Sequence, residues 1–220
     1  PTCWTQRTLW IRLKQILLIP PTNLTNPGTP PPVAEGGLRC TQINLHKTIS
    51  ATVSFDSWMA DNDVHCGLVQ EPYLNRNKVS GFNNYKIFKG ATKGITRALI
   101  IMKKSINAWL LTQFLDADQV AISVKTKDKT YVLASIYMPY DPLVIPPSTL
   151  IKKLIDFCQN NKLEFLISAD ANSHHTVWGS SDINNRGDGL LNFILSKDLY
   201  ILNKGSRPTF KILIDRKLLT

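Results

Sequence analysis

Short runs rich in β-branched and aromatic residues recur along most of the chain and are interrupted by only a few stretches with helical spacing of apolar residues. The runs typical of strands cover residues 41–45, 64–69, 85–88, 99–102, 120–124, 131–137 and 164–168. The apolar spacing predicts helices over residues 48–60 and 149–160 and a shorter one over 190–195. Many strands with few helices between them favour two packed sheets flanked by helices, in the α/β or α+β class.

Prolines set the first 38 residues apart from the rest, because seven of the thirteen prolines lie there. Clustered prolines neither continue a helix nor donate to a sheet. We therefore expect a flexible, Pro-rich leader over residues 1–38 and one globular domain over residues 39–220. Since the chain starts with Pro1 rather than Met, it is expected to be a fragment or a processed piece.

The composition narrows the classes of protein that fit. Twenty-six Lys and Arg against sixteen Asp and Glu give a net charge of +10, which favours a polyanionic partner such as nucleic acid. The four cysteines lie far apart without a C-x-x-C pair, which argues against a zinc ribbon or a disulfide scaffold and favours a reducing compartment. No run approaches the roughly 18 to 20 apolar residues of a membrane span, so no membrane partner is expected.

Residues 72–115 contain eight basic side chains and no acidic one, with aromatic residues interleaved. Basic side chains can neutralise phosphates while aromatic rings stack on bases, although each residue alone also fits a solvated face. The side chains predicted to contact DNA are Arg76, Lys78, Lys89, Lys93 and Arg97 from this stretch, together with Arg186.

Two acidic residues, Glu71 and Asp170, directly follow predicted strands, and a sheet fixes side chains at such places. In extended geometry Asp170 and Asn172 lie on one face, where a carboxylate and an amide suit a phosphate group and its attacking water. Glu71 alone, with water and substrate oxygens, is a typical Mg²⁺ ligand. We expect the two carboxyl groups to meet across a mouth of the sandwich that is open to solvent. Alternatively, the polar segment that follows Asp170 is only a long surface loop rich in turn residues.

The order of the polar motifs resembles a known family. The motifs are Gln42-Ile43-Asn44-Leu45, Gln70-Glu71-Pro72-Tyr73, Ser135-Ile136-Tyr137-Met138-Pro139, Ser168-Ala169-Asp170-Ala171-Asn172-Ser173-His174-His175, Trp178-Gly179-Ser180, Asn185-Arg186-Gly187, Leu202-Asn203-Lys204-Gly205 and Pro208-Thr209-Phe210. As an ordered set over residues 40–215 they resemble the endonuclease domain of non-LTR (LINE-type) retrotransposons, in the endonuclease/exonuclease/phosphatase superfamily.

The resemblance implies a four-layer α/β sandwich that hydrolyses a phosphodiester of double-stranded DNA with Mg²⁺ or Mn²⁺. The 3′-hydroxyl so produced would prime a reverse transcriptase encoded downstream, in the nucleus or in a cytoplasmic ribonucleoprotein. By the same resemblance Glu71 and Asn44 lie on the metal side, and Tyr137 hydrogen-bonds the scissile phosphate. Asp170 aligns or activates the water, while Asn172 holds the water or a phosphate oxygen.

The end of the chain departs from the family pattern, which has an orienting Asp and then a Ser-Asp-His triplet. Asp215 matches the orienting Asp at a short spacing, and no Ser-Asp-His occurs before Thr220. We therefore expect the sandwich to lack its last strand or strands and the activity to be weak or lost. Two other functions stay open: a non-catalytic nucleic-acid-binding remnant, and a relative acting on abasic sites or inositol phosphates.

Overall fold

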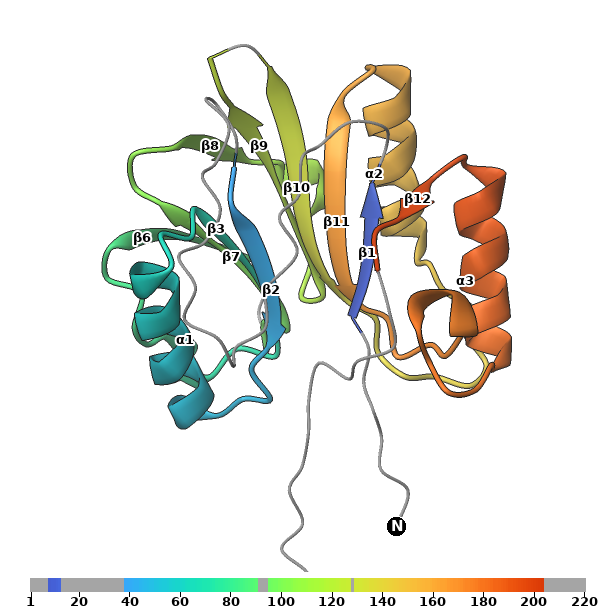
Figure 1. Ribbon diagram of the computed structural model, residues 1–220, viewed down its shortest axis with the longest axis horizontal. Helices are drawn as coiled ribbons and strands as arrows, with labels where there is room; N and C mark the ends of the chain where they lie inside the picture. Colours follow the sequence, from blue (N-terminus) through green and yellow to red (C-terminus); the bar gives the residue numbers. More distant parts are fainter. Residues whose placement is uncertain (1–7, 13–37, 91–94, 128, 204–220) are drawn as a thin grey trace, which may run out of the picture.

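Two β-sheets pack face to face with helices on their outer sides (Figure 1). The computed structural model describes residues 38–90, 95–127 and 129–203, and the backbone of residues 8–12. The layers run from α1, through a four-stranded and a six-stranded sheet, to α2 and α3 (Figure 1). This is the four-layer α/β sandwich that the sequence predicts.

The four-stranded sheet has the order β2-β3-β7-β6. Its strands are β2 (Cys40–Asn44), β3 (Cys66–Gln70), β7 (Ala98–Lys103) and β6 (Tyr85–Lys89). Strands β2 and β3 are parallel and are joined by α1 (Ile49–Asp61), whereas β7 is antiparallel to β3 and β6. A small hairpin of β4 (Leu74–Asn75) and β5 (Lys78–Val79) follows β3.

The six-stranded sheet has the order β12-β1-β11-β10-β9-β8. Its strands are β12 (Tyr200–Ile201), β1 (Thr8–Arg12), β11 (Glu164–Asp170), β10 (Thr130–Tyr137), β9 (Gln119–Lys125) and β8 (Asn107–Leu110). Strands β10 and β11 are parallel and are joined by α2 (Thr149–Asn160); the other neighbours are antiparallel.

Each helix begins at a side-chain cap that accepts a hydrogen bond from its first turn. Thr48 caps α1, Ser148 caps α2 and Asn184 caps α3 (Asn185–Ser196). The predicted helix over residues 190–195 is thus extended toward its N-terminus by the Asn184 cap. Two 3₁₀ turns, η1 (Thr112–Phe114) and η2 (Thr176–Trp178), complete the described elements. No helix of the described residues is long and apolar enough to cross a bilayer.

The apolar core is divided between the three interfaces of the four layers. Buried side chains of β3, β7, β9, β10 and β11 fill the space between the sheets, among them Leu68, Ile100, Ile122, Leu133 and Leu166. A second cluster lies under α1, and a third lies under α2 and α3. Alternate residues of a strand face opposite layers, so each central strand contributes to two of these clusters.

The structure corrects the expectation for part of the Pro-rich leader. Residues 8–12 form β1, which pairs antiparallel with β11 on one side and β12 on the other. This five-residue segment contains no proline, so its backbone can join a ladder on both edges. Strand β11 is consequently not an edge strand. The other residues of the leader before Leu38, and the predicted site residues Lys93 and Asp215, lie outside the described residues.

Candidate active site

The predicted site residues gather where four strands end at one mouth of the sandwich. Strand β2 ends at Asn44, β3 ends just before Glu71, β10 ends at Tyr137 and β11 ends at Asp170. Because β2 with β3 and β10 with β11 form parallel pairs, the carboxyl ends within each pair lie at the same edge. Residues from both sheets therefore meet here.

Asn44 connects the two carboxylates. Its Nδ2 donates to Glu71 Oε2 at 3.1 Å and to Asp170 Oδ2 at 2.6 Å. The backbone N–H of His46 donates to Asn44 Oδ1 at 2.8 Å, which fixes the orientation of the amide. One amide group thus holds carboxylates from opposite sheets together, and the expectation that Glu71 and Asp170 meet is confirmed.

A buried polar chain supports this contact from below. Gln70, which is fully buried, donates from Nε2 to Ser135 Oγ of the other sheet at 2.9 Å. Ser135 in turn donates to the carbonyl of Val69 at 2.9 Å, and Gln42 donates to Gln70 Oε1 at 2.5 Å. Polar groups that are satisfied only in one arrangement fix the two sheets relative to each other just beneath the mouth.

Asp170 lies below the rim of the mouth rather than open to solvent, which corrects that part of the expectation. The residue is only 3% exposed, and burial raises the pKa of its carboxyl group above the usual range. Hydrogen bonds from Asn44 and from the backbone of Asn172 act in the opposite direction, while the negative charge of Glu71 adds to the increase. The second oxygen, Oδ1, has no hydrogen-bond partner among the described residues.

Tyr137 and Asn172 lie beside the carboxylates. Burial raises the pKa of the Tyr137 phenol, with Glu71 and Asp170 adding to the effect and a hydrogen bond to Asn172 opposing it. Asn172 also donates from Nδ2 to the carbonyl of Met138 at 2.9 Å and has a left-handed φ of 44°. The structure therefore places a protonated hydroxyl and an amide side by side next to Asp170.

The sequence analysis did not identify two further neighbours of Glu71, a lysine and a histidine. Lys47 Nζ lies 3.3 Å from Glu71 Oε1, and His46 Nδ1 lies 3.7 Å from Glu71 Oε2. Both residues and Glu71 have left-handed φ angles, between 45° and 55°, and the Lys47 N–H donates to the Glu71 carbonyl at 2.8 Å. Their place two and three residues after Asn44, just beyond a strand end, was the available signal.

Arg97 and Asp118 link the two sheets at the same mouth. Arg97 Nη2 donates to Asp118 Oδ2 at 2.7 Å, and Arg97 Nε lies 2.5 Å from Oδ1. The Arg97 carbonyl accepts from the Glu71 N–H, and the Asp118 carbonyl accepts from the Tyr137 N–H, each at 2.8 Å. The Arg97 guanidinium also lies 5.3 Å from the centre of the Tyr137 ring. This ion pair therefore connects the backbone of Glu71 to that of Tyr137.

The predicted DNA contact of Arg186 is corrected. The residue is only 4% exposed, and its guanidinium donates to backbone carbonyls of the loops before α2 and η2. The carbonyls within 3.1 Å belong to Pro139, Asp141, Val144 and Asn172. A buried guanidinium saturated by carbonyls holds loops together and has no face left for a phosphate.

The remaining predicted DNA contacts lie close to the mouth. Arg76 and Lys78 are exposed in the β4–β5 hairpin, which directly follows Glu71 and Pro72. Lys89 ends β6 and donates to the carbonyl of Asn77 at 2.7 Å, next to the same hairpin. Their contact with DNA stays a prediction.

The oxygen atoms at the mouth fit a hard divalent cation. Among the described residues no three His, Cys, Asp or Glu side chains gather in a metal-binding group, which disfavours a zinc-type site. Mg²⁺ needs only one or two carboxylates because it keeps several waters. Glu71 and the unpartnered Oδ1 of Asp170 supply such ligands, whereas Asn44 turns its N–H groups toward them.

The fold and the site define a four-layer α/β sandwich in which both sheets contribute carboxylates to one polar mouth. Residues 131–216 match a family model described as endonuclease-reverse transcriptase. Among solved structures, the chain is similar to the endonuclease domain of TRAS1, a telomere-specific non-LTR retrotransposon, with a TM-score of 0.67 and 23% identity. That match covers 81% of this chain and 78% of the other.

A humanized D. rerio TDP2 carrying 14 mutations matches with a TM-score of 0.46 and 12% identity, over 67% of this chain and 68% of that one. A search of curated proteins finds no match. The match over residues 131–216 and the fold shared with a retrotransposon endonuclease domain both agree with the family that the order of motifs resembles.

Proposed function

We propose that the protein is a Mg²⁺-dependent endonuclease that nicks one strand of duplex DNA. The observation that carries this proposal is the Asn44 amide, which holds Glu71 and Asp170 together from opposite sheets. Two like charges are brought close only where something between them, an amide here or a cation in the working enzyme, offsets their repulsion.

The residues of the mouth fit the parts of phosphodiester hydrolysis. Glu71 would hold the cation, which when bound supplies positive charge to offset the charge growing on the phosphate oxygens. Lys47 contacts Glu71 from the solvent side and has to move aside for a cation to bind there. A 55% exposed side chain can do so at little cost.

Asp170 is suited to accept a proton from the attacking water, because its raised pKa brings it nearer to neutral pH. The water oxygen bonds to phosphorus, the bond from phosphorus to the 3′ oxygen breaks, and that oxygen leaves as a hydroxyl after taking up a proton. Tyr137 stays protonated, as its raised pKa requires, and donates with Asn172 to the phosphate oxygens. The other product is a 5′-phosphate.

Basic side chains beside the mouth would hold the duplex. Arg76, Lys78 and Lys89 lie on the elements that follow Glu71, where they can neutralise backbone phosphates. A reverse transcriptase as the partner that extends the 3′-hydroxyl belongs to the same proposal and is supported by the description of the family model that matches residues 131–216. Action on nuclear DNA is a further part of the proposal.

Nicking of supercoiled plasmid in Mg²⁺ tests the proposal. We expect Glu71→Gln and Asp170→Asn each to reduce the rate by about 10² to 10³, since each removes a charge that acts in the transition state. Glu164→Gln is the matched control, because Glu164 lies at the other end of β11 and pairs with Lys129. Undiminished nicking by both site variants, or equal loss in the control, would contradict the assignment.

A panel of substrates in the same assay separates the alternatives. Faster cleavage of an abasic duplex or of inositol phosphates than of intact duplex would assign the site to another phosphoesterase. DNA binding without any Mg²⁺-dependent cleavage would leave a nucleic-acid-binding module.

A further inference from the structure

The acid-free basic stretch of residues 72–115 is divided between the two ends of the sandwich. Strand β7 runs away from the mouth: Arg97, before its first residue, lies beside Glu71, whereas its last residue is Lys103. The turn after β7 carries Lys104 and leads into β8 with Trp109. Part of the stretch is therefore not used at the candidate active site.

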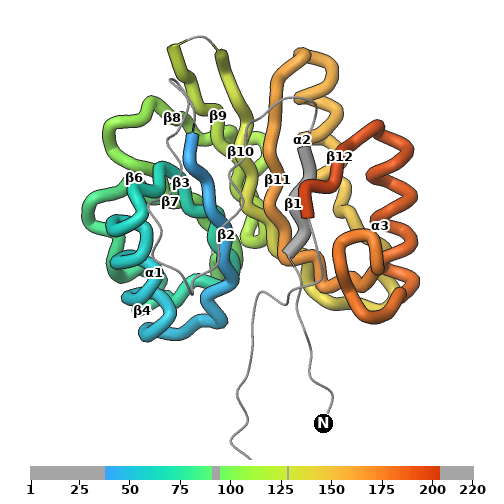
Figure 2. Tube along the Cα trace, viewed as in Figure 1, coloured from blue at the N-terminus to red at the C-terminus, as the bar shows by residue number. Residues whose placement is uncertain are grey.

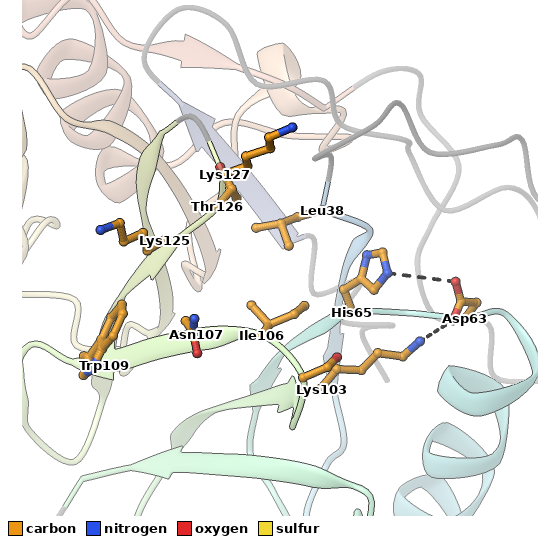
Figure 3. A pocket seen from close by; sticks show the side chains of 11 residues that line it. Leu38, Asp63, His65, Lys103, Ile106, Asn107, Trp109, Lys125, Thr126 and Lys127 are labelled. Carbon is orange, nitrogen blue, oxygen red and sulfur yellow. Dashed lines mark hydrogen bonds and ion pairs between the residues drawn. The ribbon is translucent and has the colours of Figure 1, made fainter.

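A cavity of about 870 Å³ lies at this second end. It opens where β7 and β9 end and where β3 and β8 begin, so it is separated from the mouth by the length of the strands (Figure 3). Seven residues of β9 span roughly 20 Å. The cavity lining includes Trp109, Lys103, Lys125, Lys127, His65 and Asp63.

The lining carries an excess of positive charge. Lys103 and Asp63 form an ion pair, so their charges offset each other. The positive charges of Lys125 and Lys127, on the other side of the cavity, remain (Figure 3). His65 adds none, because burial and Lys103 lower its pKa. Its Nδ1 accepts the Arg39 N–H at 2.9 Å, so the neutral ring has its proton on Nε2, which lies 3.9 Å from Asp63 Oδ2.

Trp109 gives the cavity an aromatic wall beside the lysines. Its side chain lies near Lys125 in Figure 3 and is 53% exposed on β8, which is an edge strand of the six-stranded sheet. A half-exposed indole next to two lysines is poorly explained by packing. The pairing of an aromatic surface with nearby cations is the arrangement that binds unpaired nucleotides.

We propose that this cavity is a second nucleic-acid site, which binds a single strand by stacking a base on Trp109 and placing phosphates against Lys125 and Lys127. Lys125 and Lys127 lie at the β9–β10 hairpin, beside the cavity, and an unpaired base fits a concave surface of this volume. The site is independent of the cleavage chemistry, so a strand bound there is held about 20 Å from the nicking mouth.

Fluorescence anisotropy with labelled dT₂₀ and U₂₀, in EDTA so that no cleavage occurs, tests the proposal. We expect the double variant Lys125→Gln/Lys127→Gln to bind about 10-fold more weakly at 0.1 M salt, and its log–log salt slope to fall by about 1.4. Trp109→Ala should lose about 5-fold or more, while Trp109→Phe should retain most of the affinity because it keeps an aromatic face. The DNA and RNA probes show which strand is preferred.

Lys152→Gln/Lys153→Gln is the matched control, since it removes the same charge from α2. The proposal would be overturned if this control lost as much affinity as Lys125→Gln/Lys127→Gln, if the latter lost none, or if a blunt duplex competed equally well. Plasmid nicking distinguishes the two sites, because the cavity variants should nick at the normal rate and Glu71→Gln should bind dT₂₀ normally. A chain that binds strands but never nicks would refute the endonuclease and leave this site standing.

Discussion

At the scale of single residues, Asp170 is a buried carboxyl group that a hydrogen bond from Asn44 holds at the mouth. A carboxylate that is 3% exposed carries a desolvation cost, and the structure keeps it there with only one strong side-chain donor. Active sites commonly hold such groups at the expense of stability. The cost should therefore be visible as a dependence of stability on pH.

Asp170→Asn should change the pH dependence of unfolding with a defined sign. Because the folded pKa is raised, the aspartic acid contributes stability at low pH that is lost as the pH rises through that pKa. The difference in Tm, variant minus parent, should therefore grow from about pH 4 upward in Mg²⁺-free thermal melts. Asp182→Asn is the control of opposite sign, since His174 lowers the pKa of that exposed carboxyl group. A Tm difference for Asp170→Asn that shrinks with pH would contradict the burial argument.

At the scale of elements, much of the fold follows from periodicity and caps. The predicted helices over residues 48–60 and 149–160 differ from α1 and α2 by a residue at most, because clean apolar spacing and a Thr or Ser cap act locally. The positions of the carboxylates at strand ends could also be predicted from the sequence. Strands β1, β8 and β12 could not be predicted, since β1 depends on partners far along the chain and β12 has only two residues.

Two arginines have partners that the sequence does not reveal. In sequence Arg97 and Arg186 resemble solvent-exposed cations, yet Arg97 pairs with Asp118, and Arg186, in the first turn of α3, is enclosed by carbonyls. These partners lie 14 or more positions away in the chain, so no local pattern reveals them. Lys47 was missed for the same reason, because its contact with Glu71 depends on how two strands align.

The Arg97–Asp118 pair leads to a prediction about position rather than affinity. Arg97→Lys keeps the charge and loses the fork, so the backbones of Glu71 and Tyr137 are no longer held together. We expect kcat for nicking to fall about 10- to 100-fold with little change in KM. Asp118→Asn should have the same effect, although removing an acid would by itself improve DNA binding.

Lys89→Gln is the comparison variant. Because it loses a phosphate contact, it should instead raise KM and flatten the salt dependence of KM. A rise in KM of the same size in Arg97→Lys would indicate that Arg97 contacts DNA.

At the scale of the whole molecule, the two sheets each bring half of the site, and β1 ties the start of the chain into the sheet that carries Asp170. The strand pairs Thr8 with Asp170 and Ile11 with both Ile167 and Ile201. A segment near the N-terminus therefore belongs to the structural support of the mouth (Figure 1). Figure 2 shows the same two sheets, with α1 outside one and α2 and α3 outside the other.

Ile11→Pro should reveal this support. Proline removes a backbone donor from a strand that pairs on both sides and leaves its acceptor unpaired, which costs about 1–3 kcal/mol. For a domain of this size, Tm should fall by about 2–12 °C in differential scanning calorimetry. Ile11→Val keeps the backbone donor and should melt close to the parent. If the proline variant melts with the parent, β1 does not stabilise the sheet.

The pairing of Thr8 with Asp170 joins positions about 160 residues apart, and contacts of such long range form slowly. During synthesis the first strand must wait for almost the whole domain to leave the ribosome before its neighbours exist. Until then β1 is an unpaired segment that can pair with another exposed strand edge. A chain that is made slowly, or made beside many copies of itself, is for that interval exposed to strand exchange, and the mouth that holds Asp170 is completed only when that interval ends.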